Sequence, residues 1–274
     1  PQKIETQVRL LLDNPQIMGC TTQQARAGSD LSFTRWTGEG SFLIPNTSSF
    51  MFRKDQIRES IGYWDTVRFA ADNEMIKRIE KVFGEMSVSN LSNGPFSFQR
   101  DSDSSIVADE VMGINGFVFG VRKQYREAQN HHRANATSLK YNGSVIDRPY
   151  PAPMLMRPDR KLFIEKHGHF SVALAADFRV PGSDFDSCLN EVRSQMSGGG
   201  RTALIELWDY NYVPLNRRNF MIPEMRDLVD GEIVSQLAFG DSVTCDTLLL
   251  YDPAILQHLQ RYVPRIDAKD IRVI

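Results

Sequence analysis

Residues 46–79 read NTSSFMFRKDQIRESIGYWDTVRFAADNEMIKRI, and this stretch decides how the first half of the chain folds. It predicts a strand that carries small polar residues, a turn at Gly62 that exposes an aromatic side chain and a carboxylate, and a helix over residues 73–82. Asp72 and Glu74 lie at the start of that helix. The helix dipole and the free N–H groups favour negative charge at this position.

Asp72 has two interpretations at this point. An aspartate at the start of a helix commonly caps its free N–H groups. A held, partly buried carboxylate is also what a general base for a sugar hydroxyl requires. The residue type and its position are compatible with both roles.

Outward from this stretch, hydrophobic periodicity predicts a mixture of helices and short strands in the first half. We expect helices over residues 3–13, 54–61, 71–83 and 108–128, and strands over Gln16–Thr22, Phe42–Phe52, Met86–Leu91 and Ser97–Gln99. This half is therefore α/β or α+β. The Asn and Pro residues between His131 and Pro158 favour extended backbone and indicate a linker.

The second half alternates between strands and helices. The strands are expected over Phe170–Ala175, Arg201–Leu207, Ile233–Leu237, Thr247–Tyr251 and Ile271–Ile274, and the helices over Asp186–Ser197, Ile222–Asp230 and Ala254–Tyr262. This alternation predicts a parallel sheet with crossover helices, as in a Rossmann-like domain. The expected fold class is α/β, with a first domain over 1–135, a Pro-rich linker over 136–167 and a Rossmann-like domain over 168–274.

Composition is that of a soluble globular protein. The 274 residues include 32 Lys and Arg against 34 Asp and Glu, so a net charge of −2 provides no overall attraction for nucleic acid or an acidic membrane. No stretch approaches the ~18 apolar residues that a membrane span requires. Cys20, Cys188 and Cys245 are far apart in the sequence, which disfavours a disulfide framework and favours a reducing cytoplasm.

Three motifs of the first half resemble those of the inverting family 2 glycosyltransferases of GT-A fold, especially those in long bacterial surface-polysaccharide proteins. That family commonly runs from an S-x-x-x-[FR]-R strand through a G-G-[FW]-D turn to an E-D-x-[DE]-[LM]-x-x-R helix. This chain has Ser48 or Ser49 to Arg53, then GYWD at 62–65, then ADNEMIKR at 71–78, in the same order.

The resemblance implies roles for particular residues. Asp72 becomes the catalytic base, although Ala71 replaces the usual first acid of the helix motif and leaves Glu74 as an alternative. The substrate-binding positions that it implies are Ser48, Ser49, Arg53, Gly62, Trp64, Asp65 and Arg78.

Two groups of side chains near these motifs are weaker candidates for substrate binding. Trp36, Tyr63 and Trp64 are candidates to stack on a sugar ring, with Trp64 preferred, although aromatic side chains more often belong to a core. Arg53 and Lys54 are placed to reach donor phosphates, although a basic pair at a strand end is usually solvated.

The same family binds a divalent cation and the donor diphosphate through a D-x-D pair, closely followed by a helix that reads roughly H-P-x-K-[IL]-E-x-Q. Residues 1–7 (PQKIETQ) fit that helix, so we expect the ligands for Mn²⁺ or Mg²⁺ upstream and only the acceptor-side half here, inactive alone. Asp101-Ser102-Asp103 lies after the helix and is interpreted as a surface turn. His131 and His132 are interpreted as an exposed helix end, because adjacent helical residues point roughly 100° apart.

A loop of the second half carries a further resemblance. Residues 173–183 (ALAADFRVPGS) follow the first strand of the predicted parallel sheet, where open α/β sheets bind ligands. The loop resembles the D-x-R-x-x-G-G loop in the acceptor-side N-terminal domain of GT-B glycosyltransferases, and it retains Asp177, Arg179 and Gly182.

Two classes of function follow from these observations. The first is a glycosyltransferase fragment, with an incomplete GT-A domain followed by a Rossmann-like domain, that transfers a sugar from a nucleotide-sugar donor to a glycan hydroxyl in cell-surface polysaccharide synthesis. Its expected partners are that donor and a glycan acceptor, without nucleic acid, and its expected location is the cytoplasm or the inner face of the cell membrane. The second class is a noncatalytic scaffold or a carbohydrate-binding module.

Overall fold

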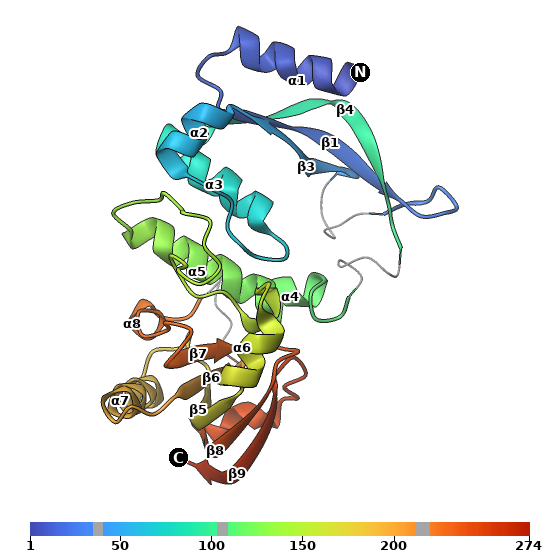
Figure 1. The fold of residues 1–274 in the computed structure, drawn as a ribbon. Coiled ribbons are helices and arrows are strands. Elements are labelled where there is room, and N and C mark those ends of the chain that lie inside the picture. Colours follow the sequence, from blue (N-terminus) through green and yellow to red (C-terminus); the bar gives the residue numbers. More distant parts are fainter. Residues whose placement is uncertain (35–40, 103–108, 212–219) are drawn as a thin grey trace. The chain divides into compact units, whose positions relative to one another are not determined.

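A computed structural model describes residues 1–34, 41–102, 109–211 and 220–274 (Figure 1). The chain is an α/β protein with one mixed sheet and one five-stranded, all-parallel sheet. It divides into two compact units, each built from two stretches of sequence. Unit 1 comprises Pro1–Asp109 and Ala136–Ile146, and unit 2 comprises Glu110–Asn135 and Asp147–Ile274.

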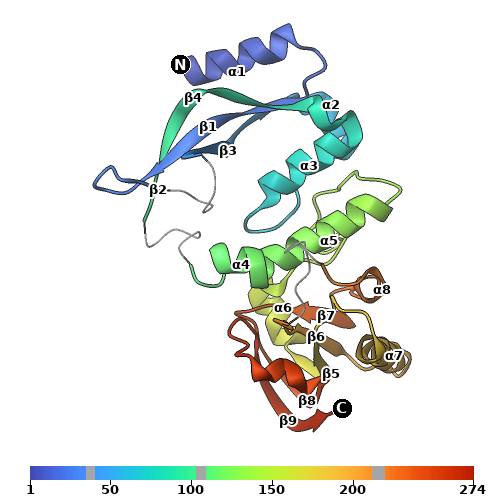
Figure 2. The same ribbon diagram turned by 180° about the vertical axis from the view of Figure 1, so that it is seen from behind.

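Unit 1 is organised around strand β1 (Gly19–Ala27). Strands β2 (Phe33–Thr34) and β3 (Leu43–Phe52) run antiparallel to β1, and β4 (Val88–Arg100) runs parallel to it. Helix α1 (Gln2–Asp13) covers one face of this sheet, and α2 (Lys54–Ile61) and α3 (Ala71–Phe83) lie on the other (Figures 1 and 2). A short 3-10 helix, η1 (Glu85–Ser87), leads into β4.

The core of unit 1 follows from the spacing of apolar residues on α2 and α3. Ile57 and Ile61 are four residues apart on α2, and Met75 and Ile79 are four apart on α3, so each pair lies on one face of its helix. These four buried side chains pack together with half-buried residues of the sheet, including Phe50, Phe52 and Val88. The core therefore fixes α3 beneath β3.

The strands of unit 1 differ from the sequence-based prediction in two places. The strand predicted over Gln16–Thr22 runs instead from Gly19 to Ala27. The two strands predicted over 86–91 and 97–99 form the single strand β4, which shifts register beside Gly94 (φ +94°). Gly94 and Pro95 interrupt the hydrophobic pattern without ending the strand, because β4 is an edge strand that tolerates both residues.

Unit 2 contains the parallel sheet, in the order β7-β6-β5-β8-β9. Its strands are β5 (His169–Ala176), β6 (Thr202–Glu206), β7 (Val234–Leu237), β8 (Ser242–Leu250) and β9 (Arg265–Val273). One core cluster packs the sheet against α7 (Ser183–Ser197) and α8 (Pro223–Arg226). A second packs it against α6 (Arg160–His167) and the 3-10 helices η2 (Met154–Met156) and η3 (Pro253–Gln257).

The last helices of unit 2 are shorter than the hydrophobic pattern predicts. The helix expected over Ile222–Asp230 is only α8, because beyond Arg226 the N–H groups of Leu228 and Val229 bond to carbonyls three residues earlier. The Asp230 carboxylate then accepts the backbone N–H groups of residues 232, 233 and 234 and starts a turn. The helix expected over Ala254–Tyr262 is the one-turn η3, and the strand expected over Ile271–Ile274 begins already at Arg265.

The middle of the chain is divided between the two units differently from the expected domain boundaries. The helix expected over 108–128 is instead α4 (Ile114–Phe119) and α5 (Val121–Asn135), and both belong to unit 2. Residues 136–146 return to unit 1. The stretch expected to be a linker contains α6 and buries Met154, Met156 and Phe163, because its few apolar residues find partners in the core of unit 2.

Within the described ranges, no helix is both long enough and apolar enough to cross a membrane.

Candidate functional site

Asp72 lies near the start of α3, but it does not cap the helix. Ala70 occupies the N-cap position with left-handed backbone (φ +66°), so the helix begins at Ala71 and Asp72 is its second residue. The Asp72 Oδ1 atom accepts the N–H of Asn73 at 2.8 Å, and Oδ2 accepts the Thr47 hydroxyl of β3 at 2.5 Å. The N-cap interpretation is therefore wrong: the carboxylate is held between α3 and β3, and it is only half-buried.

Glu74 has a different environment from Asp72. Its side chain and that of Arg78 are both 0% exposed and form an ion pair at 3.0 Å across one turn of α3. The Arg78 Nε atom donates to both carboxylate oxygens of Glu74, at 3.0 and 3.2 Å. Of the two acids that the sequence leaves as alternatives, only Asp72 presents a partly exposed carboxylate.

Arg78 holds the backbone of the Gly62 turn rather than an exposed binding surface. Nη1 donates to the Ile61 carbonyl at 2.5 Å and to the Leu139 carbonyl at 3.2 Å, and Nη2 donates to the Tyr63 carbonyl at 2.8 Å. Its guanidinium also lies 3.5 Å from the ring centre of Tyr141. Fully buried, Arg78 thus links α3, the turn and a segment that returns from much later in the sequence.

Gly62 is required by that returning segment. The backbone of Gly62 has φ +75°, and a Cβ atom there would lie 2.1 Å from the Tyr141 carbonyl oxygen. On either side of it, the Tyr63 N–H donates to the Tyr141 carbonyl and the Tyr141 N–H donates to the Ile61 carbonyl, both at 3.0 Å. A side chain at this position would separate the two segments.

The Gly62 turn exposes aromatic side chains but not its carboxylate. Trp64 is 37% exposed and packs edge-on against Phe50 and Phe52 of β3, with ring centres 6.4 and 6.1 Å away. Tyr63 is also exposed and accepts Arg58 at its hydroxyl at 2.6 Å. Asp65 is buried, contrary to the expectation from sequence. Trp36 lies outside the described residues.

The small polar residues of β3 divide into one exposed and one buried position. Ser48 is exposed. Ser49 is buried: its hydroxyl donates to the Asn46 carbonyl and accepts both the N–H and the hydroxyl of Thr22. Ser49 therefore ties β3 to β1, which is a structural role.

Arg53 follows β3 and reaches the end of α1. Its guanidinium donates to the backbone carbonyls of Leu11, Asn14 and Ile17, which close that helix and the following turn. These bonds satisfy carbonyl groups that a helix C-terminus leaves without partners. Lys54, its neighbour, is exposed at the start of α2.

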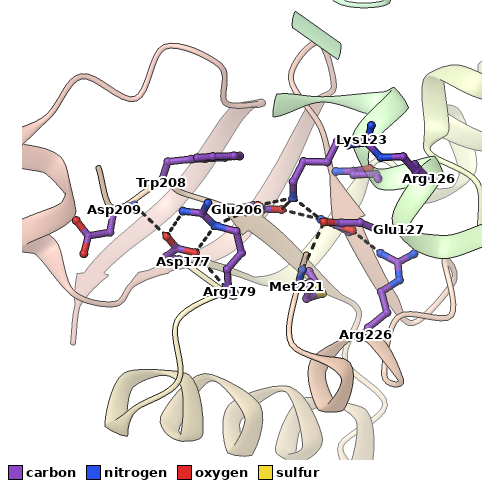
Figure 3. Close-up of polar contacts among 12 residues, drawn as sticks. Lys123, Arg126, Glu127, Asp177, Arg179, Glu206, Trp208, Asp209, Met221 and Arg226 are labelled. Atoms are coloured by element: carbon purple, nitrogen blue, oxygen red, sulfur yellow. Dashed lines mark hydrogen bonds and ion pairs between the residues drawn. The ribbon is translucent and has the colours of Figure 1, made fainter. Parts of the chain in front are cut away.

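Unit 2 contains a buried charge cluster formed by Lys123, Glu127, Asp177, Arg179, Glu206 and Arg226 (Figure 3), of which the sequence singled out only Asp177 and Arg179. Lys123 of α5 donates to Glu206, the last residue of β6, at 2.6 and 2.7 Å, and to Glu127 at 2.7 Å. Arg179 pairs with Asp177 through two hydrogen bonds, at 2.8 and 2.5 Å, and stacks 3.8 Å from the ring centre of Trp208.

The cluster is balanced, with three cationic and three acidic side chains. Burial raises the pKa of Glu206, and the attraction of Lys123 opposes that rise. Burial also disfavours the charged form of Lys123, but the attraction of Glu206 and Glu127 outweighs burial and raises its pKa. Burial lowers the pKa of Arg226, which donates to Gln236 of β7 at 2.6 Å. These side chains therefore compensate one another's charges within the cluster.

Besides the D-x-R segment of Asp177 and Arg179, the sequence carries one local signal for this cluster, the i, i+4 spacing of Lys123 and Glu127. Such pairs usually lie on the exposed face of a helix. Here Lys123 faces the carboxyl end of β6, where Glu206 accepts its hydrogen bonds, and the neighbouring Gln124 donates to the carbonyl of Leu237 at the end of β7.

The loop after β5 borders a cavity of about 140 Å³ at the carboxyl end of the parallel sheet. Its lining includes Asp177, Gly182, Asp209 and Asp252. The sheet order changes direction between β5 and β8, the place where ligands commonly bind in open α/β sheets. However, the Asp177 carboxylate is already paired with Arg179, so the acid and the arginine of the D-x-R segment bind each other.

The structure brings no metal-binding group together in the part of the chain that it describes. Among those residues, no group of three or more His, Cys, Asp or Glu side chains is placed to hold a metal ion. Asp103 lies outside the described residues. His131 is half-buried rather than exposed and pairs with Asp227 at 2.8 Å.

In comparisons with known proteins, no family model matches this α/β chain, and no curated protein matches it.

Proposed function

We propose that this chain is part of an inverting glycosyltransferase, in which Asp72 is the general base that removes the proton from a hydroxyl group of a glycan acceptor. In this proposal unit 1 is the acceptor side of a GT-A domain of family 2, and unit 2 is a Rossmann-like domain similar to the N-terminal domain of a GT-B enzyme. The reaction belongs to cell-surface polysaccharide synthesis and uses a nucleotide-sugar donor.

The observation that carries the proposal is the arrangement of the two acids in α3. Glu74 and Arg78 are fully buried and paired, whereas the Asp72 carboxylate is half-buried and anchored at both oxygens. A fixed carboxylate with partial access to solvent has the properties of a general base. The Gly62 turn that carries Trp64 is held to the same helix by Arg78, which supports a common acceptor surface.

The chemistry assigned to Asp72 is a single proton transfer. The acceptor oxygen forms a bond to the anomeric carbon of the donor sugar, and the bond from that carbon to the nucleoside diphosphate breaks. The acceptor proton passes to the Asp72 carboxylate. Attack on the face opposite the leaving group inverts the anomeric centre.

Asp72→Asn is the test of this proposal. Asparagine keeps one oxygen acceptor, so the free energy of unfolding should change by no more than ~1 kcal/mol, whereas loss of the general base should lower kcat ~10²–10⁴-fold. The assay measures sugar transfer by the protein expressed from its complete reading frame.

The matched control is Asp55→Asn, since Asp55 is an exposed acid in the first turn of α2. It should leave both turnover and stability unchanged. Full transferase activity in a folded Asp72→Asn protein would remove Asp72 from the mechanism.

The alternative is a noncatalytic scaffold or carbohydrate-binding module, favoured for unit 2 by the internal pairing of its charged residues. The two proposals differ in one measurement. A scaffold binds glycans without consuming nucleotide sugars, whereas the proposed enzyme releases a nucleoside diphosphate in an amount equal to the sugar transferred.

A further inference from the structure

We propose that Thr47 is a positioning residue for Asp72, and that its hydroxyl orients the carboxylate toward the acceptor. This inference rests on the proposed role of Asp72 as the general base. It adds a residue that none of the sequence motifs contains, because Thr47 lies one position before the serine pair of β3.

The contact joins strand β3 to helix α3. The Thr47 hydroxyl donates to Asp72 Oδ2 at 2.5 Å, and the Asn73 N–H donates to Oδ1 at 2.8 Å. Each carboxylate oxygen therefore has its own donor, one from β3 and one from α3. Two donors on different elements fix the plane of the carboxylate, which a single donor from its own helix would leave free to rotate.

Thr47 lies where the register of β3 against β1 shifts, between two residues whose side chains are bonded to other strands of the sheet. Its neighbour Asn46 is buried and donates to the Ser97 hydroxyl of β4 at 2.8 Å. Two residues further along, Ser49 is buried and bonded to Thr22 of β1. The hydroxyl that contacts Asp72 therefore projects from a strand that is cross-linked to the rest of the sheet.

A threonine suits this role chemically. Its one hydroxyl proton is donated to Asp72, and a carboxylate oxygen is the acceptor. A carboxylate has about four lone-pair sites, so two donors leave capacity for the acceptor hydroxyl. Because both Thr47 and Asp72 are half-buried, this remaining capacity lies at the boundary with solvent.

The test compares Thr47→Val, which removes the hydroxyl at nearly equal volume, with Thr47→Ser, which restores it. Thr47→Val should lower kcat about tenfold and leave KM within about twofold, because a base that is misplaced slows the chemical step and not binding. Thr47→Ser should recover most of the lost rate. In an Asp72→Asn background, Thr47→Val should lower turnover no further.

Thr21→Val is the matched control. Thr21 is a buried threonine of the same sheet whose hydroxyl donates to the Asn90 side chain at 3.0 Å. Its replacement removes a comparable hydrogen bond away from Asp72, so it should lower stability without the selective loss of kcat.

A second measurement does not depend on activity. The free energies of unfolding of Thr47→Val, Asp72→Ala and the double variant should be non-additive, because each single substitution removes the bond that the two residues share. Additive effects would show that the contact is absent in solution and would overturn the inference.

The outcomes separate this inference from the proposed function. If Asp72→Asn keeps full turnover, or if the wild-type protein transfers no sugar from any nucleotide-sugar donor, the proposed function fails and the inference fails with it. If Asp72→Asn is inactive but Thr47→Val behaves like Thr21→Val, or if Thr47→Ser does not recover the rate, only the role of Thr47 is overturned.

Discussion

Asp241 is buried in the turn between β7 and β8. Its Oδ2 atom accepts the Ala238 N–H at 2.7 Å, whereas Oδ1 has no hydrogen-bond partner among the described residues. Burial raises the pKa of this carboxyl to about 7, with the Ala238 hydrogen bond acting in the opposite direction. The folded protein therefore retains a proton on Asp241 over a pH range where the unfolded chain has lost it.

This pKa implies a pH-dependent stability with a definite sign. Between about pH 4 and pH 7 the folded state binds more protons than the unfolded state, so the free energy of unfolding should fall as the pH rises. The penalty is complete above pH 7 and is at most on the order of 4 kcal/mol. Asp241→Asn should remove this slope and stabilise the protein at pH 8 more than at pH 4, as measured by urea unfolding. A parallel pH dependence in both proteins would assign it to other groups.

At the scale of elements, the buried pair of Lys123 and Glu206 attaches α5 to the end of β6. Two charges in a buried site are balanced only while both are present, so removal of one leaves the other without compensation. Lys123→Met should lower the free energy of unfolding by about 3–5 kcal/mol. Adding Glu206→Gln to that variant should recover part of the loss, because the charge balance returns.

An exposed pair provides the control for this expectation. Arg9 and Glu5 are also separated by one helical turn, but both side chains are largely exposed. Arg9→Met should have little effect, because water and salt screen such pairs. Equal losses for Lys123→Met and Arg9→Met in denaturant unfolding would contradict the importance of burial.

The sequence was sufficient for elements whose signals are local. Helices α2 and α3 have the bounds expected from their apolar spacing, and a glycine follows each of them, Gly62 and Gly84. It was insufficient where a partner is distant in sequence. The bonds of Arg53 to the end of α1, and of Arg78 to Leu139, involve backbone carbonyls that no motif identifies.

The same limit applies to the candidate site. The sequence identified Asp72 and Glu74 together, but only the three-dimensional contacts distinguish a half-buried carboxylate from one paired with Arg78. Thr47 carried no signal, because a threonine in a strand is ordinary. Lys123 and Glu127 were assigned to the wrong unit, since their partners lie in β6 and in the segment before α8.

At the scale of the whole molecule, the two units have separate apolar cores. Ile79 belongs to the cluster beneath β3 in unit 1, and Leu204 belongs to the cluster under α7 in unit 2. Both side chains are fully buried, so either truncation to alanine should cost about 2–5 kcal/mol in its own unit.

Amide hydrogen exchange measures whether each loss of stability is confined to the unit that carries the substitution. Ile79→Ala should speed exchange of the amides in β1 and β3 and spare those in β5 and β6, and Leu204→Ala should do the reverse. A uniform increase across the chain in either variant would show that the two cores unfold as one cooperative unit.

The discontinuity of unit 1 constrains the order in which a nascent chain can complete it. The chain leaves unit 1 at Asp109 and returns only at Ala136, after α5 has been synthesised. Until residues 139–141 leave the ribosome, Arg78 lacks the Leu139 carbonyl and the ring of Tyr141, and the Gly62 backbone has no partner strand. The sheet and helices of unit 1 are therefore synthesised well before the segment that completes the surroundings of the buried Arg78. During translation, the last step in the folding of unit 1 waits for residues 139–141, which are made after helix α5 of unit 2.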